Sequence, residues 1–269
     1  MTASVLRHEL RASYAFVERN FFLSRRYWGW EIAFLVYSAA GALSISLIGA
    51  QANDPRLFLT LIVGAIFWNY LSVVFSWIAE TIQIERWEGT LEYTFMAPVR
   101  RSTHLLGAVA YAMVFGLIHT VAILVAVVLF FPDLPFGQAD YGTIVGFMLF
   151  GSFSLVGVAM LAAILPLLFV ERGMQMAFVL QSVLLLISGV YYSIDVLPGW
   201  MQVLSWFSPA TYALDGVRKG LIDGVALTEL WPDIWPLLVM GTLFIPLGLW
   251  AFGQAEKYAK RTGKLKRVG

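Results

Sequence analysis

Residues 85–101 read ERWEGTLEYTFMAPVRR and form a charged stretch between two long apolar runs of the chain. Glu85, Glu88 and Glu92 recur at i, i+3 and i+7. A helix would therefore place the three carboxylates on one face. We expect a short amphipathic helix at about 82–98, with these acids facing a soluble partner or organising the local charges. The alternative is an ordinary solvated loop.

The same stretch carries a second, apolar set of positions. Trp87, Leu91 and Phe95 recur at i, i+4 and i+8, so a helix would bring them together as a stripe that anchors it. Pro98 is expected to end the helix, because proline lacks the backbone N–H that a helix interior needs. The pattern thus predicts one helix with an acidic and an apolar side.

The composition of the 269-residue chain is that of a membrane protein. Hydrophobic residues make up 59% and charged residues only 13%, with a mean hydropathy of +0.76. The hydrophobic share exceeds that of soluble domains, and the charged share falls below it. The absence of cysteine excludes disulfides, thiol catalysis and thiolate metal sites. A net charge of +1 gives no reason to expect nucleic acid as a partner, whereas membrane lipid is expected.

Six apolar runs are each long enough to cross roughly 30 Å of hydrocarbon as a helix. They are approximately Trp30–Ala50, Leu57–Ala79, Leu105–Phe131, Ile144–Val170, Met174–Tyr192 and Ile234–Gly253. We therefore predict an all-α membrane protein with a six-span transmembrane domain over residues 27–256.

The segment before the first run, residues 1–26, is basic and amphipathic. Its apolar residues recur at helical spacing, and five arginines surround them: Leu6, Leu10, Tyr14, Val17 and Phe21, with Arg7, Arg11, Arg19, Arg25 and Arg26. This pattern is typical of a helix on the cytoplasmic membrane surface. Residues 257–269 form a second basic segment, predicted to be a cytoplasmic tail.

The distribution of Lys and Arg predicts the orientation. With the N-terminus inside, fifteen of the eighteen basic residues fall on the inner side. Only Arg56, Arg218 and Lys219 fall outside. Because cytoplasmic loops are enriched in basic residues, we expect a multi-pass plasma-membrane protein with both termini in the cytoplasm.

The segment 193–233 is predicted to lie outside and is too apolar for a solvated loop. Pro198 and Trp200 belong to its apolar first part. Ser208 and Pro209 resemble a helix start, with serine as N-cap and proline at the first helical position, and Tyr212 begins the apolar side of that helix. We predict a re-entrant helical hairpin between spans five and six. A hairpin on the surface is the alternative.

The chain lacks the sequence patterns of an enzyme. It has no G-x-x-x-x-G-K-[ST] loop for nucleotide phosphates and no metal-ligand cluster, so we predict no catalytic residue, no metal site and no cofactor bound by this chain. His119 lies within the third run without an acid at its depth, which makes a Ser–His–acid hydrolase improbable. It is expected to be a packed side chain or, alternatively, a substrate contact.

The apolar runs contain no Asp, Glu, Lys or Arg apart from Glu31, which argues against proton coupling. Sodium sites built from carbonyls and hydroxyls would not be visible in this count. The candidate substrate path consists of mildly polar residues: Asn69, Ser72, Ser76, His119, Gln181 and Ser188. Hydrogen bonds between helices are the other interpretation of these residues.

Two motifs resemble the permease subunit of ABC type-2 exporters. The family pattern E-R-x-x-G-T-[LF]-E, followed by a proline, is matched by Glu85, Arg86, Gly89, Thr90, Leu91, Glu92 and Pro98. The second pattern lies in the outer stretch and is matched by Ser188, Gly189, Leu197, Pro198, Pro209, Tyr212 and Arg218. Their order in a six-span chain extends the resemblance over nearly the whole length.

The resemblance implies a homodimer or heterodimer of permeases with two separate nucleotide-binding ATPase subunits in the cytoplasm of a bacterium or archaeon. The stretch with Glu85, Glu88 and Glu92 would be the coupling helix, and Glu171 with Arg172 would make a smaller second contact. ATP and magnesium are expected on the partner subunit.

The resemblance also bears on the substrate. Polysaccharide and teichoic-acid permeases often carry an R-D-x-K-x-R-Y run before the first span, where this chain reads ERNFFLSRRYWGW at 18–30. This departure favours export of an amphipathic drug, antibiotic or lipid-like molecule over a lipid-linked polysaccharide or teichoic acid. A stand-alone channel or sodium-coupled carrier is the alternative of a different class.

Overall fold

The computed structural model describes residues 3–52, 54–132, 134 and 138–265, and this part of the chain is helical without strands. Its elements are α1 (Ala3–Arg26), α2 (Trp28–Gln51), α3 (Pro55–Glu88), α4 (Leu91–Met96), α5 (Arg101–Phe130), α6 (Tyr141–Ala162), α7 (Ile164–Leu168), α8 (Gly173–Ile187), η1 (Ile194–Val196), α9 (Gly199–Ser205), α10 (Pro209–Ile222), η2 (Leu227–Glu229) and α11 (Trp231–Arg261). The predicted all-α class is confirmed. Residues 266–269 of the predicted basic tail and residues 1–2 lie outside the described residues.

Five helices of the described chain are long and apolar enough to cross a membrane: α2, α3, α5, α6 with α7, and α11. The fifth predicted run, Met174–Tyr192, is shorter than expected, because α8 has fifteen residues and ends at Ile187. Gly189 follows with a φ of 64°, a left-handed conformation in which the helix cannot continue. The structure therefore shows five such helices and one short apolar helix, and the sixth span stays a prediction.

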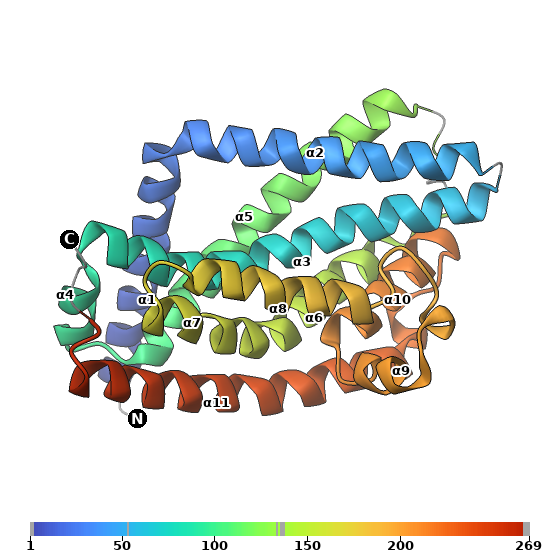
Figure 1. Cartoon of the computed structure of the whole chain (residues 1–269). Helices are drawn as coiled ribbons and strands as arrows, with labels where there is room; N and C mark the ends of the chain where they lie inside the picture. Colours follow the sequence, from blue (N-terminus) through green and yellow to red (C-terminus); the bar gives the residue numbers. More distant parts are fainter. Residues whose placement is uncertain (1–2, 53, 133, 135–137, 266–269) are drawn as a thin grey trace.

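The long helices lie side by side, and α1 lies across one end of them (Figure 1). The two marked chain ends and α4 are at this same end, while α9 and α10 are at the other. The central element is α3, which packs against α2, α5, α6, α8 and α10. Its Tyr70, Val74 and Ile78 are completely buried.

Close approach of two backbones joins α6 to α11. An added Cβ at Gly157 of α6 would lie 2.2 Å from the backbone carbonyl carbon of Phe244 in α11. Within lipid there is no hydrophobic driving force for two helices to associate. Small residues let the helices approach closely, and the contact is then stabilised by van der Waals packing. The helix α11 also continues through Pro236 and Pro246 without interruption.

The segment 193–233 contains the two short helices that the sequence predicts, α9 and α10. Pro209 occupies the first turn of α10 as expected, but Ser208 makes no side-chain capping bond. Its hydroxyl lies 2.7 Å from that of Ser188 instead, because α10 packs close to the end of α8. Trp200 is exposed and Tyr212 is partly buried. The re-entrant depth of this hairpin stays a prediction.

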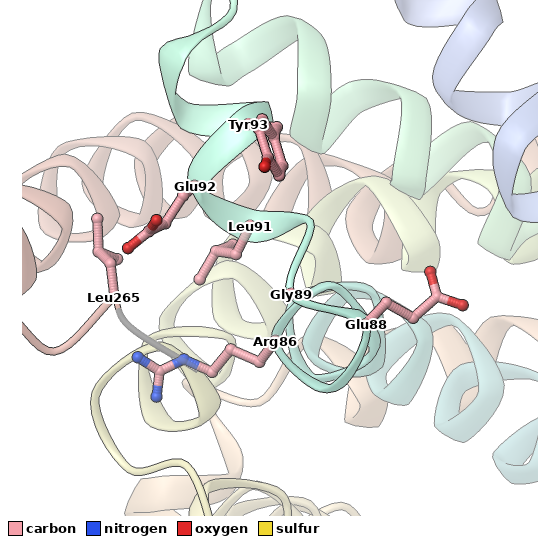
Figure 2. A pocket seen from close by; sticks show the side chains of 7 residues that line it. All are labelled: Arg86, Glu88, Gly89, Leu91, Glu92, Tyr93 and Leu265. Atoms are coloured by element: carbon pink, nitrogen blue, oxygen red, sulfur yellow. The ribbon is translucent and has the colours of Figure 1, made fainter. Parts of the chain in front are cut away.

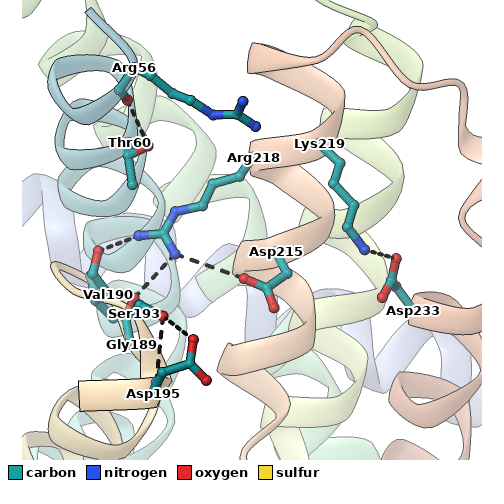
Figure 3. Close-up of polar contacts among 10 residues, drawn as sticks. All are labelled: Arg56, Thr60, Gly189, Val190, Ser193, Asp195, Asp215, Arg218, Lys219 and Asp233. Atoms are coloured by element: carbon teal, nitrogen blue, oxygen red, sulfur yellow. Dashed lines mark hydrogen bonds and ion pairs between the residues drawn. The ribbon is translucent and has the colours of Figure 1, made fainter. Parts of the chain in front are cut away.

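Polar contacts fix α10 to its neighbours (Figure 3). Arg218 donates from Nη1 to the carbonyl of Gly189 at 3.2 Å and from Nη2 to that of Val190 at 2.7 Å. Because α8 ends at Ile187, no further helical turn donates hydrogen bonds to these carbonyls. On the other side, Lys219 contacts Asp233 at 2.6 Å, which ties α10 to α11. The guanidinium of Arg218 thus joins α10 to the end of α8.

Replacing Arg218 with Met should lower the free energy of unfolding, because two shielded carbonyls lose a charged donor. Hydrogen bonds to charged groups contribute about 1.5–3 kcal/mol each. Arg56→Met is the matched control, since Arg56 pairs with Asp223 at the surface, where such pairs contribute about 0–1 kcal/mol. Thermal unfolding of both variants in the same detergent measures the difference. Equal unfolding temperatures would contradict the role of Arg218.

Candidate functional site

The stretch 85–101 is bent. The helix α3 continues to Glu88, and Gly89 then adopts a φ of 73°, a left-handed conformation that favours glycine. The N–H of Thr90 bonds to the carbonyl of Glu85 at 2.8 Å, which closes the end of α3, and α4 begins at Leu91. The predicted single helix over about 82–98 is therefore wrong: two helices meet at Gly89.

The carboxylate of Glu85 is 1% exposed and joins three helices. Its Oε1 forms an ion pair with Nη2 of Arg19 in α1 at 2.5 Å and lies 2.8 Å from Nε2 of His104 in α5. Phe16 covers the His104 ring, with 4.6 Å between the ring centroids. Arg19 thus supplies the opposite charge for this buried carboxylate, and His104 supplies a second polar contact.

The three acids of the stretch do not share one face, contrary to the sequence prediction. Glu85 points into the protein, while Glu88 contacts the guanidinium of Arg26 at 3.4 Å at the edge of the bundle. Glu92 is exposed on α4, beyond the bend. The left-handed residue at Gly89 changes the helical register, so the sequence spacing no longer places Glu92 on the side of Glu85 and Glu88.

The apolar stripe is also divided. Leu91 and Phe95 are buried as predicted, but Trp87, on α3 before the bend, is 64% exposed. Leu91 and Phe95 therefore anchor α4 to the core without Trp87. Pro98 is exposed just after α4 ends at Met96.

Arg101, at the start of α5, holds the end of α4 in place. Its guanidinium donates to the carbonyls of Thr94 at 3.0 Å and Phe95 at 2.5 Å. It also contacts Glu256 of α11 at 2.8 Å and lies 4.5 Å from the centre of the Phe95 ring. A cation near the carbonyls at a helix C-terminus is stabilising. The helix α4 is thus fastened to α5 and α11.

The outward side of α4 is apolar and acidic. Tyr93 is 73% and Met96 71% exposed, and Glu92 lies beside them. A hollow of about 300 Å³ lies at this place, and Figure 2 shows the side chains that line it. Its lining combines residues around the bend with one from the C-terminal segment: Arg86, Glu88, Gly89, Leu91, Glu92, Tyr93 and Leu265.

The second predicted contact, Glu171 and Arg172, lies in the exposed connection between α7 and α8. The side chain of Gln83 donates to the carbonyl of Val170 at 3.1 Å, which ties this connection to the last turns of α3. Both predicted contact regions are therefore at the end of the protein where α4 lies.

The structure brings together only some of the predicted substrate-path residues. Ser76 of α3 donates to Gln181 of α8 at 3.1 Å, and Ser188 contacts Ser208. These are hydrogen bonds between neighbouring elements, as the second interpretation expects. His119 is buried on α5 against Phe115, with ring centroids 4.5 Å apart. The remaining two, on α3, are partly buried: Asn69 and Ser72.

Sequence reasoning missed four residues that shape the site: Arg19, Arg101, His104 and Glu256. Arg19 and His104 are distant in sequence from Glu85, and Arg101 is distant from Glu256. No spacing along one helix connects the members of these pairs. Glu256 alone carried a usable signal, as an acid beside a basic tail.

Replacing Glu85 with Ala should destabilise the protein strongly, because Arg19 and His104 would lose their shared carboxylate. Removing one partner of a buried pair costs on the order of 3 kcal/mol. Glu88→Ala removes a surface pair and should cost about 0–1 kcal/mol. Denaturant or thermal unfolding in detergent distinguishes the two. Similar losses in both variants would show that Glu85 does not fasten the three helices.

Residues 14–222 match the model of the ABC-2 type transporter family. Two relatives come from Escherichia coli (strain K12). The first, named "Probable multidrug ABC transporter permease YbhR", is 26% identical over 159 residues, which are 58% of this chain and 42% of that protein. The second, "Inner membrane transport permease YadH", is 28% identical over 188 residues, 66% of this chain and 69% of that protein.

The chain thus spans less than half the length of YbhR and about two thirds of YadH. The family match covers most of the chain, including both motifs, α1 from residue 14 and the helices through α10. The chain belongs to the ABC-2 type transporter family of membrane permeases.

Proposed function

We propose that this chain is the permease subunit of an ATP-driven exporter and that α4 is its coupling helix. The observation that carries the proposal is that one side of α4 is fixed to the bundle and the other side is exposed. Leu91, Phe95 and Arg101 fix α4 to the bundle, while Tyr93 and Met96 face outward. Exposed apolar side chains next to acids, at an end where basic residues gather, are typical of a protein-docking surface.

The partner in this proposal is a separate cytoplasmic ATPase subunit that binds ATP and magnesium. The permease itself has no phosphate-binding loop in its sequence. Glu92, Tyr93 and Met96 make the main contact, and Glu171 with Arg172 supplies the smaller one at the same end of the protein. Glu85 and Arg86 act from inside, by holding the bend, rather than by touching the ATPase.

The transport path in this proposal lies between two permease copies. The spans of one copy carry few ionisable groups. A polar pathway through a single bundle would therefore have few side chains to line it. The short helix α8, extended by residues 188–192, completes the sixth crossing. An amphipathic drug, antibiotic or lipid-like substrate fits the mild polarity of Ser76 and Gln181, and the printed name of YbhR supports a drug. A lipid-linked polysaccharide or teichoic acid is the alternative.

The proposed orientation places α4 in the cytoplasm and α9 outside. Because the chain has no cysteine, single cysteines at Tyr93 and Val196 report each side without background. A membrane-impermeant maleimide added to intact cells should label Val196→Cys, and should label Tyr93→Cys only after the cells are opened. Labelling of Tyr93→Cys in intact cells would reverse the topology.

The coupling role predicts that Tyr93→Asp and Met96→Asp lose the ATPase subunit. A charge would enter an apolar contact, so co-purification and substrate-stimulated ATP hydrolysis in liposomes should both fall about tenfold or more. Val196→Asp, an equally exposed position at the other end, should retain both. If all three variants behave like the wild type, α4 is a solvated segment, and a stand-alone channel or sodium-coupled carrier becomes the better interpretation.

A further inference from the structure

The chain reverses direction directly after α11. Gly263 adopts a φ of 67°, and the N–H of Lys264 bonds back to the carbonyl of Ala259 at 2.9 Å. A left-handed glycine followed by such a bond is a common way to end a helix and turn the chain. The turn, residues 262–265, brings Leu265 to the hollow beside α4 (Figure 2).

Arg86, in the last turn of α3, binds the backbone of this turn. The residue is 3% exposed, and its Nη2 donates to the carbonyl of Lys264. Within the described part of the chain, that carbonyl is the only hydrogen-bond acceptor of the guanidinium. A buried guanidinium without an acceptor is costly, so the position of the turn and the bend at the end of α3 depend on each other.

A second contact fixes the same turn. The ammonium of Lys264 lies 5.2 Å from the ring centre of Tyr258 in α11 and 5.8 Å from that of Phe169, just after α7. Cations at such distances are attracted to the faces of aromatic rings. The turn is thus placed between α3, α7 and α11, beside both predicted contact regions.

The hollow has a mixed lining, in which two leucines and Tyr93 stand beside charged side chains. The carboxylate of Glu92 extends towards Leu265, while that of Glu88 points away from the two leucines (Figure 2). Glu92 is exposed and has no hydrogen bond or ion pair with the described residues. The buried guanidinium of Arg86 is directed towards the backbone of the turn and does not pair with Glu92.

We propose that the turn 262–265 is part of the docking surface and that the hollow receives a segment of the ATPase in which an apolar side chain adjoins a basic one. The apolar side chain packs against Leu265, and the basic group pairs with Glu92. This inference rests on the proposed coupling function. It adds the C-terminal turn as a second wall and defines the chemistry of the partner.

The test uses the full chain in nanodiscs and the nucleotide-binding subunit that co-purifies with the wild type, purified separately and titrated at several salt concentrations. Leu265→Asp should weaken binding about tenfold, and Leu265→Ala less. Glu92→Lys should weaken binding and remove most of its salt dependence, because a screened ion pair is lost. Thr262→Asp, exposed in the same turn but outside the hollow, should bind normally.

The outcomes separate this inference from the function on which it rests. Wild-type binding by Leu265→Asp and Glu92→Lys, with binding lost in Tyr93→Asp, would overturn the role of the turn and keep α4 as the docking helix. Normal binding by all of them would overturn both. An equal loss in Thr262→Asp would also contradict the inference, since the effect would then not depend on the hollow. Unfolding temperatures of each variant exclude misfolding as the cause.

Discussion

The arrangement of the end of the protein that carries α4 depends on one desolvated carboxylate. Glu85 has left water, and a buried charge is stable only where its partners are held close. Arg19 and His104 supply those partners from α1 and α5. Together they determine where α1 crosses the bundle, where α5 begins and where α3 can end. The position of α4 follows, because only Gly89 and Thr90 separate it from α3.

The short connection gives α4 a mechanical role that a free loop could not have. A force on its exposed side passes to α3 through the bend at Gly89 and to α5 and α11 through Arg101. Because α3 packs against seven of the other helices, displacement at one end reaches most of the bundle. Close-packed interiors transmit such strain rather than absorb it. This is the physical basis on which docking at α4 could drive transport.

The sequence predicts those features that depend on local composition. Apolar length alone identifies α2, α3, α5, α6 with α7, and α11, and amphipathic spacing identifies α1. Prediction from the sequence fails where the local structure depends on the backbone conformation of one residue or on a residue far away in the chain. The bend rests on the backbone conformation of Gly89, and the early end of α8 involves Arg218, 29 residues from Gly189. Burial of Glu85 needs Arg19 from another helix, which no periodicity reveals.

A count of basic residues predicts the orientation in the membrane better when the structure shows which of them bind backbone carbonyls, and three arginines do so. Arg86, Arg101 and Arg218 each donate to backbone carbonyls at the end of a helix or turn. Such residues are structural, and their sign says little about sidedness. On the proposed outer side the other two basic residues, Arg56 and Lys219, are paired with aspartates.

The proposed inner side, in contrast, keeps basic side chains exposed to solvent on α1 and α11, among them Arg11, Arg25, Lys257 and Arg261. The asymmetry of unburied charge is therefore stronger than the simple count of fifteen to three suggests. Because exposed basic residues near membrane ends are those that set orientation, the structure strengthens the argument for placing α4 and the turn 262–265 in the cytoplasm, where an ATPase can reach them.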